Sequence, residues 1–352
     1  MPSLIKAGRG LFEQSGRLMR EAGIGGRAFV VTDRNVYAHY GQPLAEVLAR
    51  EGFDPCLNMV NAGEQTKTLR SLELLYEWLA SSRAERGDVV VALGGGVVGD
   101  LAGFLAATFL RGMALVQIPT TLLAQVDSSI GGKTGVNLPS AKNMVGAFYQ
   151  ANLVLIDPGL LATLPAREYR SGLGEVVKYG VIMDAPMFEL LDSRQSDVLA
   201  QTPELIDSIV ARCAALKEEV VTEDEREAGR RTILNFGHTI GHAIEAATNY
   251  EALLHGEAIS IGMSGAAQIA VELEKFDGAT CQRLQMLLKG LGLPYAARGL
   301  DWQLVRGAMA LDKKTAAGRI RWVLPRELGD VEVTQEVPGD VVDTVLQRLL
   351  NA

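Results

Sequence analysis

Cysteine and histidine are both scarce in this chain, and the scarcity of cysteine already excludes some kinds of protein. The 352 residues include only three cysteines, Cys56, Cys213 and Cys281, which are scattered and odd in number. This pattern argues against a disulfide framework and against a cysteine zinc cluster. The longest uncharged run, residues 112–126, contains several polar residues and is too short to span a bilayer.

The chain also lacks a basic excess and a recognisable targeting segment. Its formal net charge is -8, so no global field attracts nucleic-acid phosphates. Its first residues do not follow the basic-then-apolar order of a signal peptide. We therefore expect a cytoplasmic protein without nucleic-acid or membrane partners. A length of 352 residues favours two domains.

Short apolar runs predict strands in the first half of the chain, and helical periodicity dominates the second half. Continuous apolar runs between helical segments are typical of a parallel sheet covered on both faces. The sequence predicts a Rossmann-like α/β domain over residues 1–170 and an all-α domain over residues 171–352, with one late strand or hairpin at 319–324. The predicted strands are 27–32, 88–93, 114–118 and 152–156, and the predicted helices are 172–179, 205–222, 238–248 and 257–274.

A glycine-rich segment, residues 93–103, follows one predicted strand and opens a helix. Glycines at such a turn let backbone N–H groups approach a pyrophosphate, and the helix N-terminus favours negative charge. The spacing differs from the G-x-G-x-x-G fingerprint, so a tight packing turn is the alternative. Polar strand ends at 32–35 and 119–121 lie where an open sheet binds ligands, and they favour the nucleotide hypothesis.

Three of the four histidines, His238, His242 and His255, lie in one short window. Imidazole is the commonest side-chain ligand for zinc and similar metals. A helix would place His238 and His242 on one face, and a catalytic metal needs three protein ligands with one open position. Spacing alone leaves two ligand sets open: all three histidines, or two of them with a carboxylate from elsewhere. A packing or hydrogen-bonding role is the alternative for any single histidine.

Several cationic side chains stand beside glycine, asparagine or acidic residues. An isolated lysine is usually a surface charge, but small neighbours permit close approach to an anion. The segments 130–133 and 141–143 have this character and are predicted to be loops. The pattern indicates a small phosphorylated or carboxylated substrate. The cations are Lys133, Lys142, Lys178, Lys217, Arg231, Lys313 and Lys314.

Long motifs over nearly the whole chain resemble those of the 3-dehydroquinate synthase family. One group lies in the first half, including Gln117-Ile-Pro-Thr-Thr-Leu-Leu-Ala-Gln-Val-Asp-Ser-Ser-Ile-Gly-Gly-Lys133. The second half adds Asn235-Phe-Gly-His-Thr-Ile-Gly-His242. The remaining matching segments are 94–104, 109–112, 142–149, 171–180, 254–257 and 312–314.

The resemblance implies that the first domain binds NAD+ and that the second binds one divalent metal, Zn2+ or Co2+. By position, Glu175, His238 and His255 would be the metal ligands. His242 would instead contact the substrate or its phosphate. The implied ligand set therefore differs from the three-histidine set that spacing left open.

The resemblance also assigns the other polar positions. The implied catalytic residues are Lys133, Asn143, Lys178, His242, Asp127 and Glu227. The implied substrate-binding residues are Lys142, Lys217, Arg231, Asn235, Lys313, Lys314 and Arg111, of which Arg111 would reach into the partner's site in a homodimer. The implied NAD-binding residues are Asp33, Asn35, Glu64, Lys67, Gly95, Gly96, Val97, Asp100, Thr120, Thr121, Lys133, Lys142, Thr163 and Glu168.

The implied substrate is 3-deoxy-D-arabino-heptulosonate 7-phosphate, and the implied product is 3-dehydroquinate. Transient oxidation at C5 by NAD+ would acidify C6, so that phosphate leaves by elimination. Return of the hydride, ring opening and an intramolecular aldol closure would complete the reaction. The protein would then be a phosphate-eliminating carbon–oxygen lyase of the shikimate pathway, which leads to chorismate and the aromatic amino acids.

Two related activities and two departures from the family pattern accompany this interpretation. Cyclases that make 2-deoxy-scyllo-inosose or epi-valiolone act on substrates without a carboxylate, so Arg231 and Lys217 favour dehydroquinate synthase. Metal-dependent polyol dehydrogenases would release NADH, and the lysine-bearing loops favour elimination instead.

The chain is expected to lack the family's strand before Gly8, and Ala151 stands where proline is common.

Overall fold

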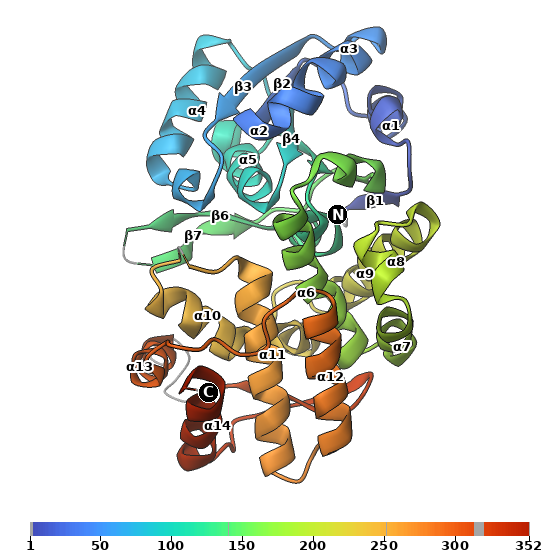
Figure 1. The fold of residues 1–352 in the computed structure, drawn as a ribbon. Coiled ribbons are helices and arrows are strands. Elements are labelled where there is room, and N and C mark those ends of the chain that lie inside the picture. Colours follow the sequence, from blue (N-terminus) through green and yellow to red (C-terminus); the bar gives the residue numbers. More distant parts are fainter. Residues whose placement is uncertain (1–2, 140, 251, 313–319, 352) are drawn as a thin grey trace. The chain divides into compact units, whose positions relative to one another are not determined.

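The computed structural model describes residues 3–139, 141–250, 252–312 and 320–351, which fall into two compact units (Figure 1). The first unit comprises Met1–Pro165 and Val210–Arg226, and the second comprises Ala166–Ile209 and Glu227–Ala352. Within these described stretches, every helix is too short or too polar to cross a membrane.

Six parallel strands form the sheet of the first unit, in the order β1-β8-β5-β4-β2-β3. Every residue of β4 and β8 is buried, as expected for a parallel sheet covered on both faces. All four predicted strands are present, and the predicted Rossmann-like layer is confirmed. The strands are β1 (Leu4–Ala7), β2 (Ala28–Asp33), β3 (Pro55–Val60), β4 (Val89–Gly94), β5 (Ala114–Pro119) and β8 (Leu153–Ile156).

The N-terminal strand that the chain was expected to lack is present as β1. Leu4 to Ala7 pair in parallel with Leu153 to Ile156, and the Gly8 N–H donates to the Ile156 carbonyl at 3.0 Å. Four residues at a partly exposed edge carry little apolar periodicity, which explains why the sequence did not reveal this strand. The expectation of a missing strand is therefore wrong.

Helices and one hairpin complete the first unit. The hairpin pairs β6 with β7 in antiparallel register. Residues 130–132 precede it without helix or strand, as the predicted loop at 130–133 requires, whereas the loop predicted at 141–143 is wrong because these residues begin β7. Lys133 is the first residue of β6, and Lys142 lies in β7. The elements are α1 (Ser15–Glu21), α2 (Arg34–Val36), α3 (Gln42–Arg50), α4 (Leu69–Ser81), α5 (Gly96–Thr108), β6 (Lys133–Leu138) and β7 (Ala141–Phe148).

The second unit is mostly helical, and the predicted helices are present. It also contains an antiparallel hairpin of β9 and β10, close to the late strand that the sequence predicted, so it is not purely α-helical. Its elements are α6 (Ala166–Ile182), α7 (Ala185–Ser193), α8 (Gln195–Leu199), the start of α9 (Pro203–Glu223), α10 (His238–Ala247), α11 (His255–Glu272), α12 (Gly278–Gly290), α13 (Trp302–Asp312), β9 (Trp322–Glu327), β10 (Asp330–Thr334) and α14 (Gly339–Asn351).

Helix α9 belongs to both units, because its residues from Val210 onward cluster with the sheet unit. The two units are thus not separated by a single cut in the chain. The predicted assignment of cofactor binding to residues 1–170 and of metal and substrate binding to residues 171–352 stays a prediction.

Candidate active site

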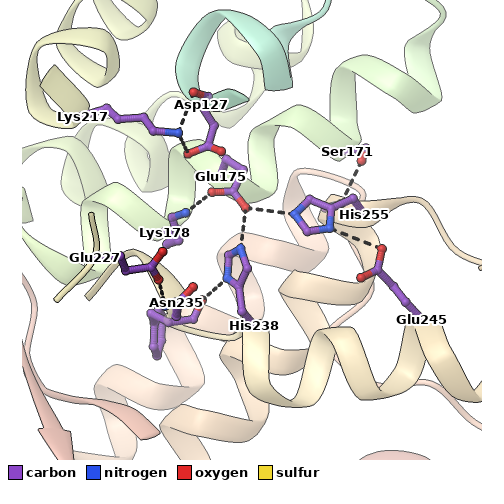
Figure 2. Close-up of polar contacts among 12 residues, drawn as sticks. Asp127, Ser171, Glu175, Lys178, Lys217, Glu227, Asn235, His238, Glu245 and His255 are labelled. Atoms are coloured by element: carbon purple, nitrogen blue, oxygen red, sulfur yellow. Dashed lines mark hydrogen bonds and ion pairs between the residues drawn. The ribbon is translucent and has the colours of Figure 1, made fainter. Parts of the chain in front are cut away.

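Three helices of the second unit bring Glu175, His238 and His255 together (Figure 2). Glu175 lies within α6, whereas each histidine is the first residue of its helix. The Glu175 Oε1 atom lies 3.7 Å from His238 Nε2 and 3.6 Å from His255 Nε2. The Glu175 carboxylate is fully buried, and the Lys178 ammonium forms an ion pair with its other oxygen. The cluster combines the donor types that zinc prefers.

Glycines allow α6 and α11 to meet backbone to backbone beside this cluster. A Cβ atom at Gly256 would lie 1.8 Å from the Ser171 carbonyl oxygen, and one at Gly174 would lie 2.8 Å from the Gly256 carbonyl oxygen. The Gly256 N–H also donates to Ser171 Oγ at 3.0 Å. Since Gly174 precedes Glu175 and Gly256 follows His255, this contact places the carboxylate and the imidazole in reach of each other.

A second glycine contact positions His238. Gly237 has a φ of 80°, the left-handed region that favours glycine, and it immediately precedes α10. A Cβ atom at Gly262 of α11 would lie 1.9 Å from the Gly237 carbonyl oxygen. The start of α10 therefore packs directly on the backbone of α11, and the His238 and His255 rings meet edge to face with centroids 5.5 Å apart.

The second nitrogen of each histidine has an oxygen partner. His238 Nδ1 lies 3.2 Å from the Phe236 carbonyl oxygen, and His255 Nδ1 lies 3.4 Å from Glu245 Oε1. Such partners hold Nδ1–H and leave Nε2 available to a metal. Glu245 was not predicted from the sequence. Its spacing from His238 and His242 on one helix, seven and three residues, is the signal that could have revealed it.

Charges around the cluster set the protonation of its members. Burial raises the pKa of Glu175, but the Lys178 ammonium and the two histidines outweigh it and hold the pKa well below its ordinary value. Burial and the Lys178 charge lower the pKa of His238, so its imidazole is neutral. Burial also lowers the pKa of His255, but hydrogen bonds to Glu175 and Glu245 outweigh it and raise the pKa to about 10. A metal that binds here must displace the His255 proton.

The geometry fits a divalent metal. Zinc bonds of about 2.0–2.1 Å in a tetrahedron hold the ligand atoms about 3.3 Å apart, close to the two separations measured here. The Glu175 carboxylate is fully buried, pairs with the Lys178 ammonium through one oxygen and turns the other, Oε1, toward both histidines. A metal cation at Oε1 would further offset the cost of burying this charge. His242, Glu245 and His255 form a second possible set, but His242 is exposed. The more enclosed set is therefore the better candidate.

The other predicted substrate residues of the helical unit are mostly buried near the same helices. Arg231 is 2% exposed on a short helical turn, Arg230–Asn235, and Lys178 is 1% exposed. Asn235 Nδ2 donates to Glu227 Oε1 at 2.5 Å. Burial of charged side chains at this density is typical of a site for a charged ligand. Lys313 and Lys314 lie outside the described residues.

The sheet unit holds a further cation pair. Lys217, on the part of α9 that belongs to this unit, is 5% exposed. Its Nζ atom lies 2.7 Å from Asp127 Oδ1 and donates to the Asp127 carbonyl at 2.6 Å (Figure 2). Both residues were predicted to handle the substrate, and the structure brings them together within one unit.

The glycine-rich turn leads from β4 into α5. A Cβ atom at Gly95 would lie 2.9 Å from Thr121 Cγ2, and one at Gly96 would lie 2.9 Å from Ser128 Oγ. Within the described part of the chain, the buried hydroxyls of Thr120 and Ser128 have no hydrogen-bond partner. Free hydroxyls beside the N-terminus of a 13-residue helix are suited to a phosphate group.

Three further predicted NAD-binding residues, Asp33, Thr163 and Glu168, lie in different surroundings. Asp33 caps α2 by accepting from the N–H groups of Asn35 and Val36, at 2.8 and 3.1 Å. Thr163 Oγ1 donates to Tyr40 Oη at 2.9 Å. Glu168 lies in α6 of the helical unit, so the structure does not group it with the other predicted cofactor residues.

Two family models match consecutive parts of the chain. The N-terminal model of 3-dehydroquinate synthase matches residues 57–171, and the C-terminal model matches residues 172–315. The chain belongs to the 3-dehydroquinate synthase family. The resemblance that its motifs suggested is thus confirmed.

Curated relatives extend over nearly the whole chain. A 3-dehydroquinate synthase of Nostoc punctiforme is 49% identical over 340 residues, which cover 96% of this chain and 94% of the relative. One of Caldanaerobacter subterraneus subsp. tengcongensis is 46% identical over 331 residues, with coverage of 94% and 93%. The C-terminal family model, residues 172–315, includes Glu175, His238 and His255.

Solved structures of two other synthases share the fold. The 2-epi-5-epi-valiolone synthase ValA of Streptomyces hygroscopicus subsp. jinggangensis, solved with NAD+ and Zn2+, is 30% identical with a TM-score of 0.92, covering 99% of this chain and 97% of its own. A 2-deoxy-scyllo-inosose synthase, solved with carbaglucose-6-phosphate, NAD+ and Co2+, is 27% identical with a TM-score of 0.89, covering 98% and 96%. A probable glycerol dehydrogenase of Sinorhizobium meliloti, 15% identical, shows a shared fold alone.

Replacing Gly256 with alanine is expected to disrupt the cluster. The added Cβ would clash with the Ser171 backbone, and we expect a loss of about 3 kcal/mol in the free energy of unfolding together with a lower bound-zinc stoichiometry. Thermal melting and elemental analysis measure both quantities. Gly278→Ala is the matched control, because its Cβ would meet only Val271 at 4.0 Å. Equal effects of the two substitutions would contradict the role of the close contact.

Replacing Glu245 with glutamine is expected to weaken metal affinity by about 10- to 100-fold, because the His255 ring loses its carboxylate partner. Competition with a chromogenic chelator measures the affinity. Glu257→Gln provides the control, since the Glu257 carboxylate accepts from Arg167 and from the Leu254 N–H instead of binding a histidine. An unchanged zinc affinity in Glu245→Gln would remove Glu245 from the site.

Proposed function

We propose that the protein converts 3-deoxy-D-arabino-heptulosonate 7-phosphate to 3-dehydroquinate and phosphate, acting as a carbon–oxygen lyase. The observation that carries this proposal is the convergence of Glu175, His238 and His255 in a chain of this family. The predicted cytoplasmic location and the absence of nucleic-acid and membrane partners stay predictions.

In this proposal each unit binds one cofactor. NAD+ would be held in the sheet unit by the glycine turn and the predicted residues around it, and a divalent metal, Zn2+ or Co2+, by Glu175, His238 and His255. When bound, NAD+ supplies a transient two-electron oxidation and the metal supplies Lewis-acid polarisation. The structures of ValA and of 2-deoxy-scyllo-inosose synthase, which contain NAD+ and Zn2+ or Co2+, support this assignment.

The residues of the chain itself would bind and orient the substrate. The Arg231 guanidinium is suited to a bidentate contact with the carboxylate, a group that the substrates of the related cyclases lack. Lys217 is held in place by two contacts to Asp127, so its ammonium is already ordered before an anion arrives. Ordered side chains lower the entropic cost of orienting a flexible sugar phosphate. His242 is exposed, and its ring lies beside those of His238 and His255, with centroids 5.2 and 6.0 Å apart, so it suits a phosphate contact.

Phosphate release tests the proposed reaction. With catalytic NAD+, the protein should release one phosphate per 3-deoxy-D-arabino-heptulosonate 7-phosphate without net NADH, and a chelator should abolish the release. A heptulose phosphate that lacks the carboxylate is the control and should react at least about 100-fold more slowly, since it offers the Arg231 guanidinium no carboxylate to bind. Preference for that sugar would favour a related cyclase, and stoichiometric NADH would favour a polyol dehydrogenase.

We also propose that the protein is a homodimer. Leu110 and Arg111 have φ values of 50° and 63°, a left-handed turn that is uncommon outside glycine and that is kept where neighbours enforce it. Three apolar side chains of the same unit are exposed, Leu110 at 40%, Met144 at 60% and Phe148 at 50%. Exposed apolar side chains along an edge strand such as β7 are suited to a partner surface. A second copy would also receive the predicted contact from Arg111.

Subunit complementation tests this arrangement. Arg111→Ala and Lys178→Ala should each be nearly inactive alone. A mixture that exchanges subunits should recover up to about a quarter of the wild-type activity, because a mixed dimer has one site with both side chains intact. Absence of recovery in a mixture shown by mass spectrometry to contain mixed dimers would place Arg111 in the site of its own subunit.

A further inference from the structure

Asn137 joins two segments that were predicted to serve different ligands. Its Nδ2 atom donates to Glu64 Oε1 at 2.7 Å, and its Oδ1 atom accepts from the Asn143 N–H at 2.8 Å. Glu64 is a predicted NAD-binding residue, whereas Asn143 is a predicted catalytic residue. No prediction from the sequence included Asn137, although its side-chain amide uses both of its polar atoms to connect them.

The backbone of Asn137 strengthens the same connection. The Asn137 N–H donates to the Lys67 carbonyl at 2.8 Å, and Asn137 forms an isolated parallel β-bridge with Thr68. Lys67 is 4% exposed, and its Nζ atom donates at 2.5 Å to both Asp100 Oδ2 and Asn143 Oδ1. The β6–β7 hairpin is thus tied to the segment 64–68 through Asn137 and through Lys67.

Asn143 depends on these contacts for its conformation. Its φ of 56° lies in the left-handed region, which a non-glycine residue keeps only when its surroundings favour it. Asn137 fixes the Asn143 backbone from one side, and Lys67 fixes its side chain from the other. Loss of the Asn137 amide would free the backbone and leave Glu64 without this donor.

We propose that Asn137 is a positioning residue that couples NAD+ binding to binding of the substrate by the β6–β7 hairpin. The inference rests on the proposed function, because it takes Glu64 and Lys67 as cofactor contacts and Asn143 as a substrate contact. A cofactor that orders Glu64 and Lys67 also orders Asn143 through the shared hydrogen bonds. Linkage then requires that the substrate raise the affinity for NAD+ by the same factor.

The test compares Asn137→Ala with Asn137→Asp in the full-length protein. A titration measures the Kd of NAD+ with and without a carbocyclic phosphonate analogue of the substrate, which cannot eliminate phosphate. Wild type should show a coupling factor of about 10, and Asn137→Ala should reduce it to about 1. Asn137→Asp keeps the acceptor for Asn143 but repels Glu64, so it should weaken NAD+ binding about tenfold and leave binding of the analogue alone unchanged.

Asn152→Ala is the matched control, since Asn152 Oδ1 also accepts a backbone N–H, from Leu115 at 3.0 Å, but contacts neither segment. It should keep the wild-type coupling even if it lowers the melting temperature. Hydrogen exchange of residues 141–148 in the cofactor-free protein should accelerate in Asn137→Ala alone. Coupling that is absent from wild type, or retained in Asn137→Ala, would overturn the proposal. Failure of wild type to bind both NAD+ and the analogue would instead overturn the proposed function.

Discussion

Close backbone contact between helices is the constraint on which the candidate site depends. A metal ion holds its ligands at fixed distances. Three side chains from distant parts of the chain must therefore be placed to within a fraction of an ångström. In the helical unit, Gly256 against Ser171 and Gly262 against Gly237 leave no room for a Cβ atom. Backbones that touch directly have few alternative arrangements, because no side chain can adjust between them. Packing therefore constrains where the three candidate ligands lie, and the contacts to Nδ1 orient the two histidine rings.

In the sheet unit, the candidate ligand-binding residues lie in loops that follow buried strands. Its parallel strands end at one edge, where the glycine turn after β4 and the polar ends of β2 and β5 follow buried apolar runs. A rigid core can thus support loops whose backbone is free to approach a ligand. The β6–β7 hairpin adds lysines and Asn143 to this framework, and hydrogen bonds to the segment 64–68 hold it in place.

The sequence predicted the parts of the fold that have strong local periodicity. Strands β2, β4, β5 and β8 are continuous apolar runs, and they were found within one or two residues. Strand β3 contains Pro55 and Asn58 and is only half-buried, and the hairpin is rich in glycine and lysine, so neither showed an apolar pattern. Local propensity carries little information where burial is partial.

The site was harder to predict than the fold. Histidine spacing found the window but could not choose a carboxylate, because Glu175 lies 63 residues before His238 and meets it only through tertiary packing. Resemblance to a family supplied Glu175. Glu245 had a helical spacing that could have been used, whereas the link from Asn137 to Glu64 spans 73 residues and has no local signal.

The shared helix α9 has a consequence for how the protein is made. The sheet unit includes residues 210–226, so a ribosome must synthesise part of the helical unit before the sheet unit has all its residues. Until then the carboxylate of Asp127 lacks the Lys217 ammonium that neutralises it. A fragment that stops near residue 165 would omit this lysine and the helix that carries it. The sheet unit can therefore be completed only after the chain has been synthesised beyond residue 226, and its folding depends on the segment between its two parts.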